Sequence, residues 1–155
     1  MIVRPAVAAD LPALLALIQG VADEHAALEP DYFRAGQAPV AARVRAAMAS
    51  SQQLLLVAQR DGQVVGLLRA KVERIPDLGF LAGLACLKVS ELAVAPATRR
   101  GGIGKALLAA AETWARQQGL DEVRLSVWSR NADALAFFDA GGYRPASQTR
   151  IKRLR

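Results

Sequence analysis

The feature that most constrains the fold is a series of strand, glycine-rich loop, helix and strand in the second half of the chain. The run Leu87–Ala95 is apolar and β-rich and is ended by a proline. From Ile103 onward apolar residues recur at helical spacing up to Gly119, and the run Val123–Ser129 predicts the second strand. Because a helical crossover joins strands that run in the same direction, we expect a parallel pair with a right-handed connection.

The rest of the chain predicts antiparallel strands and further helices. Two apolar, β-rich runs, Leu54–Gln59 and Val64–Lys71, flank the pair Asp61-Gly62, which favours the tight turn of a hairpin. We expect helices over residues 11–25, 40–49 and 131–140, an irregular connection over 23–39, and closing strands at Tyr143–Arg144 and Arg150–Leu154. The sequence therefore predicts a single α/β domain over residues 1–155, with a mixed central β-sheet flanked by helices.

Composition narrows the classes of function. Cys86 is the only cysteine and His25 the only histidine, so we expect no metal site; we expect His25 to pack or cap a helix and Cys86 to be inert. No apolar run is long enough to cross a bilayer and the first residues lack a signal-peptide layout, which predicts a soluble cytoplasmic protein with no membrane partner. The net charge of +6 favours an anionic ligand, such as a nucleic acid or a phosphate-rich cofactor.

The loop Arg99–Lys105 has the properties of an anion site. Its glycines let the backbone approach a ligand closely, and the first N–H groups of the following helix lack partners. The helix dipole adds about half a positive charge and three basic side chains add formal charge, which suits a pyrophosphate. A nucleotide-triphosphate loop is excluded by Arg99 and Ala106, and a dinucleotide fingerprint is excluded by Leu107, where a glycine would be required.

The remaining pattern resembles the signature of the GCN5-related N-acetyltransferase (GNAT) family, which reads Gln or Arg, two residues, Gly, one residue, then Gly or Ala. Arg99, Gly102 and Gly104 match this signature. The resemblance extends from about Glu91 to Tyr143, and the elements around the loop occur in the order typical of that family. The protein is therefore identified as resembling an acetyltransferase that uses acetyl-coenzyme A.

The resemblance implies a cleft in which the strand before the loop diverges from the strand Val123–Ser129 and the pantetheine arm lies like an additional strand. It also implies that the Val94 N–H polarises the thioester carbonyl, that a primary amine of a small molecule or a protein attacks directly in a ternary complex, and that the protein could form a homodimer. The residues that we expect to contact the coenzyme are Leu92, Ala93, Val94, Arg99, Arg100, Gly101, Gly102, Ile103, Gly104, Lys105, Asn131 and Phe138.

Direct transfer to an amine requires a proton acceptor, for which Glu91 is the best candidate. Strand alternation places Glu91 on one face with Leu87, Val89, Ala93 and Ala95, and a carboxylate among apolar neighbours suits a general base. The alternative is a structural carboxylate that pairs with an arginine. The general acid is not assigned, because Phe138 stands where the family often has a tyrosine. The candidates that could replace it are Tyr143, Tyr32, Ser126 or water.

Two functions of other kinds remain open. The net charge and the tract Arg99–Gly102 suggest a basic RNA-binding module, but aromatic residues make up only 5% of the chain and no basic-aromatic platform is present, which argues against a nucleic-acid partner. The missing tyrosine permits a catalytically degenerate domain that binds acetyl-coenzyme A as a sensor. The acceptor cannot be identified from the sequence, because its pocket depends on the connections 23–39 and 72–86.

Overall fold

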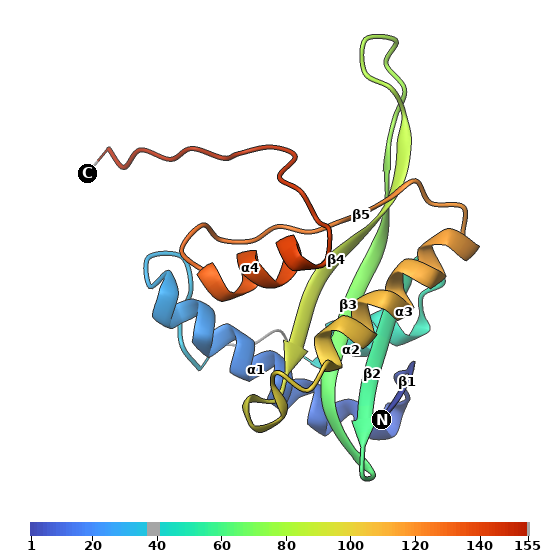
Figure 1. Ribbon diagram of the computed structural model, residues 1–155, viewed down its shortest axis with the longest axis vertical. Helices are drawn as coiled ribbons and strands as arrows, with labels where there is room; N and C mark the ends of the chain where they lie inside the picture. Colours follow the sequence, from blue (N-terminus) through green and yellow to red (C-terminus); the bar gives the residue numbers. More distant parts are fainter. Residues whose placement is uncertain (37–40, 155) are drawn as a thin grey trace.

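A mixed β-sheet forms the centre of the fold (Figure 1). The computed structural model describes residues 1–36 and 41–154, and within these ranges five strands follow one another in the order β1-β2-β3-β4-β5. The strands are β1 (Ile2–Pro5), β2 (Gln53–Arg60), β3 (Gln63–Ile75), β4 (Leu84–Val94) and β5 (Glu122–Arg124). Neighbours from β1 to β4 are antiparallel, whereas β4 and β5 are parallel. The predicted mixed sheet, hairpin and parallel crossover are confirmed, and β1 is a strand that the sequence did not predict.

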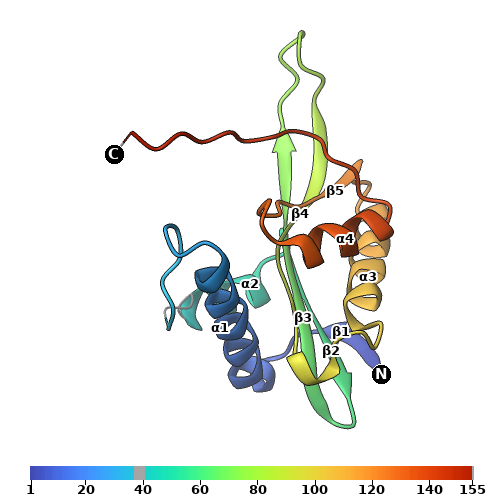
Figure 2. The ribbon, with the colours of Figure 1, turned by 60° about the vertical axis from the view of Figure 1, so that its left-hand side comes forward.

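Helices cover both faces of this sheet (Figures 1 and 2). Helices α1 (Leu11–Leu28) and α2 (Ala41–Ala49) lie on one face, and α3 (Ile103–Gln117) and α4 (Ala132–Ala140) lie on the other. The predicted helices are confirmed to within a few residues at their ends; residues 37–40, which belong to the predicted connection and the predicted start of the second helix, lie outside the described residues. None of the helices in the described ranges combines the length and the apolar character needed to span a membrane.

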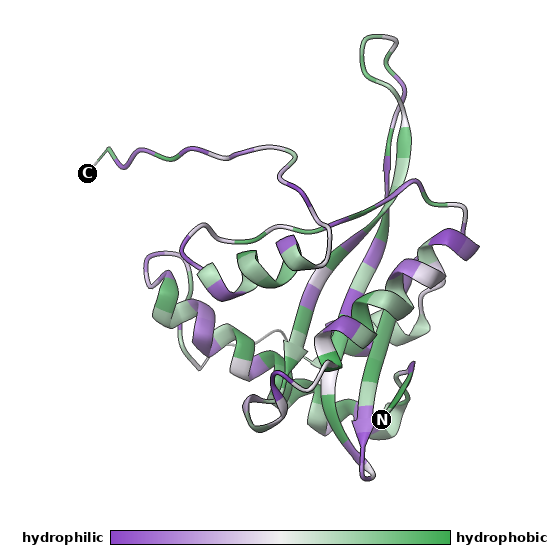
Figure 3. Ribbon diagram, viewed as in Figure 1, coloured by the Kyte–Doolittle hydropathy of each residue, from purple (hydrophilic) through white to green (hydrophobic). Residues whose placement is uncertain are grey.

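Apolar residues from the two faces of the sheet form two separate clusters. One cluster joins Leu14 and Ile18 of α1 to the sheet, and the other joins Leu107 and Ala111 of α3 to the opposite face. Figure 3 shows the corresponding concentration of hydrophobic residues along the strands and the polar residues along the outer side of α3. The alternation of side chains along each strand therefore decides which cluster a residue joins.

A β-bulge at Ser90 interrupts that alternation in the middle of β4. Val89 and Glu91 pair with consecutive residues of β3, so Ser90 is an extra residue without a partner there. A bulge bends its strand and changes the direction in which the following side chains point. As a result Val89 belongs to the cluster under α3, whereas Ala93 belongs to the cluster under α1. Without the bulge, the even spacing of these two residues would place them on one face.

Two predictions about the last third of the chain are wrong. The strand expected over Val123–Ser129 is only β5, which pairs with Cys86–Lys88, because β4 and the chain after β5 diverge and a strand needs a neighbour for its hydrogen bonds. Tyr143–Arg144 and Arg150–Leu154 do not form closing strands, since none of the described strands lies beside them. Figures 1 and 2 show that the segment after α4 runs away from the sheet.

Candidate active site

The loop Arg99–Lys105 shapes the N-terminus of α3. A 3-10 turn, Pro96–Thr98, leads into the loop from the end of β4. Arg100 and Gly102 adopt left-handed backbone conformations, with φ values of 64° and 76°, and turn the chain into the helix. Among the described residues, no side chain caps α3 at Gly102. The N–H groups of the first helical turn are therefore available to an anionic ligand, as the sequence predicted for this segment.

The three glycines of the loop serve different physical purposes. A Cβ atom at Gly101 would lie 3.1 Å from the Thr98 carbonyl oxygen, and one at Gly104 would lie 3.1 Å from Phe137 Cζ. Gly104 therefore allows α4 to pack against the first turn of α3. A Cβ atom at Gly102 would meet nothing within 4 Å, although its positive φ disfavours a side chain there. Gly102 thus borders open space in front of the helix N-terminus.

The basic side chains around the loop also differ in what they contact. Arg99 forms an ion pair with Glu24 of α1, and its Nε donates a hydrogen bond to the Val94 carbonyl oxygen at 3.2 Å. Its side chain thus joins α1 to the end of β4, while Arg100 and Lys105 are exposed. Arg60 was not predicted from the sequence; its guanidinium lies 3.4 Å from the Cβ position of Gly101. No local signal marks it, because the pairing of β2, β3 and β4 is what brings the Asp61-Gly62 turn to the same end of the sheet as the end of β4.

The backbone of β4 is open on one side at the site. The Ala95 N–H donates to the Val65 carbonyl on β3 at 2.8 Å, so the preceding residue, Val94, directs its N–H to the opposite side of the strand. The same alternation directs Leu92 to the open side and Ala93 toward β3. Because the pairing with β5 is confined to Cys86–Lys88, residues 91–94 have no strand beside them on this side among the described residues, and we call this unpaired side of β4 the opening.

Glu91 begins this open half of β4 directly after the bulge. Its Oε2 accepts a hydrogen bond from Arg69 Nε at 2.9 Å, and the two side chains are only 15% and 21% exposed. The predicted face is wrong, because the bulge turns Glu91 with Ala93 toward the α1 side and away from Val89. The carboxylate is thus an ion-paired group beside the opening, which is the arrangement weighed as the structural alternative.

Helix α4 borders the site through its N-terminus and its paired aromatic rings. Asn131 caps α4, since its Oδ1 accepts a hydrogen bond from the Ala134 N–H at 3.1 Å. Phe138 packs against the cluster under α3, and its ring centroid lies 5.7 Å from that of Tyr143. The Tyr143 hydroxyl donates to Glu112 at 3.0 Å, and burial together with that carboxylate raises the pKa of Tyr143. A hydroxyl held in this way is a poor proton donor for a leaving group.

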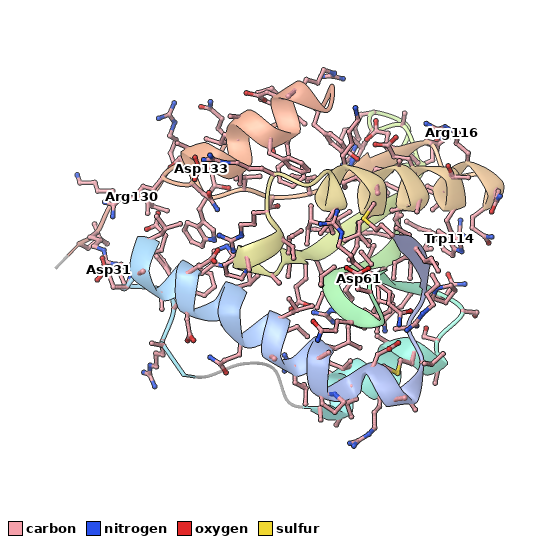
Figure 4. The ribbon with its side chains drawn as sticks, turned by 60° about the horizontal axis from the view of Figure 1, so that its bottom comes forward. Asp31, Asp61, Trp114, Arg116, Arg130 and Asp133 are labelled. Carbon is pink, nitrogen blue, oxygen red and sulfur yellow. The ribbon has the colours of Figure 1, made fainter. Side chains whose placement is uncertain are left out.

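A second group of residues lies between the end of α1 and the chain after β5, and its members Trp128 and Glu29 were not predicted from the sequence. His25 stacks on Phe33 with ring centroids 5.0 Å apart, and Trp128 contacts both Tyr32 and Phe33. His25 Nδ1 also lies 2.9 Å from the Val21 carbonyl oxygen, which confirms its packing role. Glu29 is only 8% exposed, and its Oε1 lies 3.9 Å from Arg130 Nε. Figure 4 shows Asp31 and Arg130 together on this side of the molecule.

The structure thus brings most of the predicted residues to one region. Residues 91–94, the loop and the start of α3 are continuous there, and the contact of Phe137 with Gly104 attaches α4 to them. The side chain of Ile103 does not reach this region, because it is 1% exposed and packs in the core. Only the backbone of Ile103 faces the loop. Phe138 is likewise a packing residue.

Comparison with known proteins agrees with this geometry. The model of the acetyltransferase (GNAT) family matches residues 21–143. N-acetyltransferase family 8 member 7 of Mus musculus is 31% identical over 105 residues, which is 68% of this chain but 44% of that protein. The chain therefore spans less than half the length of this mouse relative. Aminoglycoside N(6')-acetyltransferase type 1 of Klebsiella aerogenes is 26% identical over 117 residues, or 76% of each chain.

Solved structures share the fold. A variant of the BH1408 protein of Bacillus halodurans superimposes with a TM-score of 0.95 at 25% identity and covers 100% of both chains. The aminoglycoside N-acetyltransferase AAC(6')-Iy, solved in complex with CoA, has a TM-score of 0.76 at 17% identity over 99% of both chains. The family model matches most of the length of this chain, and the expected loop lies at the N-terminus of α3. This chain therefore belongs to the GNAT family of acetyltransferases.

Proposed function

We propose that this protein is an N-acetyltransferase that transfers the acetyl group of acetyl-coenzyme A to a primary amine. Membership of the GNAT family supports this proposal, as do the acetyltransferase relatives and the CoA complex of a protein with the same fold. The observation that carries it is the position of the uncapped α3 N-terminus at the mouth of the opening beside β4. The acceptor is an amine of a small molecule or of a protein. The free thiol of Cys86 suits a reducing compartment such as the cytoplasm.

The residues around the opening fit the coenzyme in both charge and shape. The uncapped N–H groups at Gly104 and Lys105 suit a pyrophosphate, and the open space in front of Gly102 leaves room for it. Arg60 and Arg100 add positive charge nearby. The backbone of β4 on its open side offers an extended arm the hydrogen bonds of a neighbouring strand.

Acetyl-coenzyme A supplies the activated thioester, and the chain supplies orientation and proton transfer. In this arrangement the Val94 N–H donates a hydrogen bond to the acetyl carbonyl oxygen, where negative charge develops during attack. A lysine-like amine with a pKa of about 10.4 requires about 4–5 kcal/mol to lose its proton at pH 7, so an acceptor for that proton matters. Glu91 is assigned this role, directly or through water. Its ion pair with Arg69 fixes the carboxylate in position.

Calorimetric titration with acetyl-coenzyme A tests the proposal through two matched variants. Gly102→Glu introduces a carboxylate in front of the α3 N-terminus and should weaken binding by at least about tenfold. Gly119→Glu is the control, because Gly119 has a similar φ of 67°, has nothing within 4 Å of its Cβ position, and lies beyond the other end of α3. Equal affinities of the two folded variants would contradict the proposed site.

A thiol-release assay with a panel of amines then separates the two coenzyme-dependent functions. Turnover on any amine supports an acetyltransferase. Tight binding without turnover on aminoglycosides, polyamines and peptides would favour a sensor domain instead. Salt-sensitive RNA binding without coenzyme binding would favour the nucleic-acid module.

A further inference from the structure

Arg60 is the last residue of β2, and its side chain reaches the loop that precedes α3. Its Nη2 and Nη1 atoms lie 3.4 and 3.5 Å from the Cβ position of Gly101. Figures 1 and 2 show the β2–β3 turn and this loop at the same end of the sheet. Because Gly101 has no side chain, the guanidinium can lie directly against the loop backbone. Two elements that are distant in the sequence therefore place a positive charge beside the N-terminus of α3.

The guanidinium of Arg60 has no counter-ion within the described part of the protein. It forms no ion pair with residues 1–36 and 41–154, and neither does the neighbouring Asp61. Arg99 differs, because its guanidinium is already paired with Glu24 and its Nε donates to a backbone carbonyl. A guanidinium presents five N–H donors in a fork that matches the oxygens of a phosphate. The donors of Arg60 are therefore available to an anionic ligand at the loop.

Arg100 adds a second arginine beside Gly101. It is exposed and, in the part of the chain that the structure describes, it forms no ion pair. Its φ of 64° is left-handed, a conformation that glycine adopts without strain and that a residue with a side chain adopts at a cost in energy. Backbone strain of this kind is concentrated at ligand sites. The strain therefore points to a role of the Arg100 side chain in binding.

Acetyl-coenzyme A carries two separate phosphate groups, and the loop region has two kinds of donor. The pyrophosphate suits the uncapped N–H groups of the first turn of α3. The 3′-phosphate on the ribose is a monoester, with about 1.5–2 negative charges at pH 7 and three acceptor oxygens. The helix N-terminus supplies only about half a positive charge, so a second phosphate requires formal charge from side chains. Arg60 and Arg100 meet this requirement, since each brings one full positive charge.

We propose that Arg60, together with Arg100, binds the 3′-phosphate of acetyl-coenzyme A and thereby distinguishes the coenzyme from its 3′-dephospho form. Arg60 is then a specificity residue for the coenzyme, and the missing side chain at Gly101 lets it reach the ligand. This proposal rests on the acetyltransferase function, because it takes acetyl-coenzyme A as the ligand of the loop. The other source of the same chemistry is the pyrophosphate, which both forms of the coenzyme contain.

Calorimetric titration with acetyl-coenzyme A and with 3′-dephospho-acetyl-coenzyme A tests this assignment. Arg60→Gln should weaken binding of acetyl-coenzyme A by about tenfold or more and leave binding of the dephospho form unchanged. Arg74→Gln is the matched control, because Arg74 is exposed, forms no ion pair among the described residues, and lies near the other end of β3, about 35 Å along the strand. This control removes the same charge and should keep the wild-type preference.

The possible failures are distinguishable. A folded wild type that does not bind acetyl-coenzyme A would refute the acetyltransferase function itself. If the wild type binds and Arg60→Gln behaves like the control, only the assignment of Arg60 is overturned. An equal loss for both ligands would place Arg60 on the pyrophosphate and would also overturn it.

Arg100→Gly provides an independent readout, because it removes the backbone strain together with the side chain. It should weaken acetyl-coenzyme A binding and reduce the preference over the dephospho form without lowering the melting temperature. A purely structural role of Arg100 would instead lower the melting temperature and leave the preference intact, and that result would overturn the part of the proposal that concerns Arg100.

Discussion

The contact between Gly104 and Phe137 predicts a measurable coupling between α3 and α4. In Gly104→Ala the new Cβ atom would lie 3.1 Å from Phe137 Cζ and 3.5 Å from Cε2, whereas ordinary contact begins at 3.4 Å. Either the ring or the whole of α4 must therefore move by a few tenths of an ångström. Phe137 is 37% exposed, so the ring can yield in part.

Two opposing effects determine the size of the change. Overpacking costs about 1–3 kcal/mol, and partial exposure of the ring favours the lower half of that range. Replacing a helical glycine by alanine contributes up to about 1 kcal/mol of stability. We therefore expect Gly104→Ala to lower the free energy of unfolding by about 0–2 kcal/mol in the wild-type background. In a Phe137→Ala background the clash is absent, and Gly104→Ala should raise the free energy of unfolding by up to about 1 kcal/mol.

Urea denaturation of the wild type, the two single variants and the double variant measures this coupling as a double-mutant cycle. The expected coupling energy is about 1–2 kcal/mol, well above the scatter of about 0.3–0.5 kcal/mol found for independent sites. Acetyl-coenzyme A affinity of Gly104→Ala should fall as well, because the displaced Phe137 ring or α4 changes the surface beside the first turn of α3. Additive effects within that scatter would refute the idea that Gly104 is a glycine in order to accommodate Phe137.

Three further predictions concern named polar groups. Glu91→Gln should lower kcat about 10²–10⁴-fold with unchanged acetyl-coenzyme A affinity, as measured by thiol release and calorimetry; an unchanged kcat would leave Glu91 only its structural pairing. Tyr143→Phe should cost about 1 kcal/mol of unfolding free energy, because Glu112 loses a donor, without slowing turnover, and a large fall in kcat would identify the hydroxyl as the acid. Hydrogen bonds from Arg4 hold the pKa of Asp10 below its ordinary value of 3.8, although burial opposes them. Since the folded value is the lower one, this stabilisation is complete above about pH 4 and is lost as the pH falls through the folded value. The difference in unfolding free energy between wild type and Asp10→Asn should therefore shrink on acidification, and a constant difference would contradict this account.

The predictions from sequence succeeded where a local pattern determines the structure. The Asp61-Gly62 turn, the start of α3 after Gly102 and its end before Gly119 all depend on residues that tolerate positive φ, and these are visible in the sequence. The loop could be recognised for the same reason, because its glycines and basic residues are adjacent. Local chemistry was thus sufficient for the elements that surround the proposed coenzyme site.

The predictions failed where a structure depends on partners distant in the chain. Nothing in the sequence around Ser90 distinguishes a bulge from a regular strand, so the face assigned to Glu91 was wrong. The segments after β5 and after Tyr143 have strand-like composition, but a strand also needs a neighbour, and the described chain provides none. The contact of Arg60 with the loop likewise requires the pairing of β2, β3 and β4.

The bulge at Ser90 has a consequence for how sequence variation is tolerated along β4. Positions that accept polar residues should alternate in one phase from Leu84 to Val89 and in the opposite phase from Glu91 to Val94. Loss of one residue on either side of Ser90 would bring the two halves into a single phase and exchange the faces of Glu91 and its neighbours. Substitutions in Leu84–Val89 and in Glu91–Val94 should therefore be tolerated independently of each other. A deletion next to Ser90 should not be tolerated, because it would move the Glu91 side chain from the α1 side of the sheet to the α3 side.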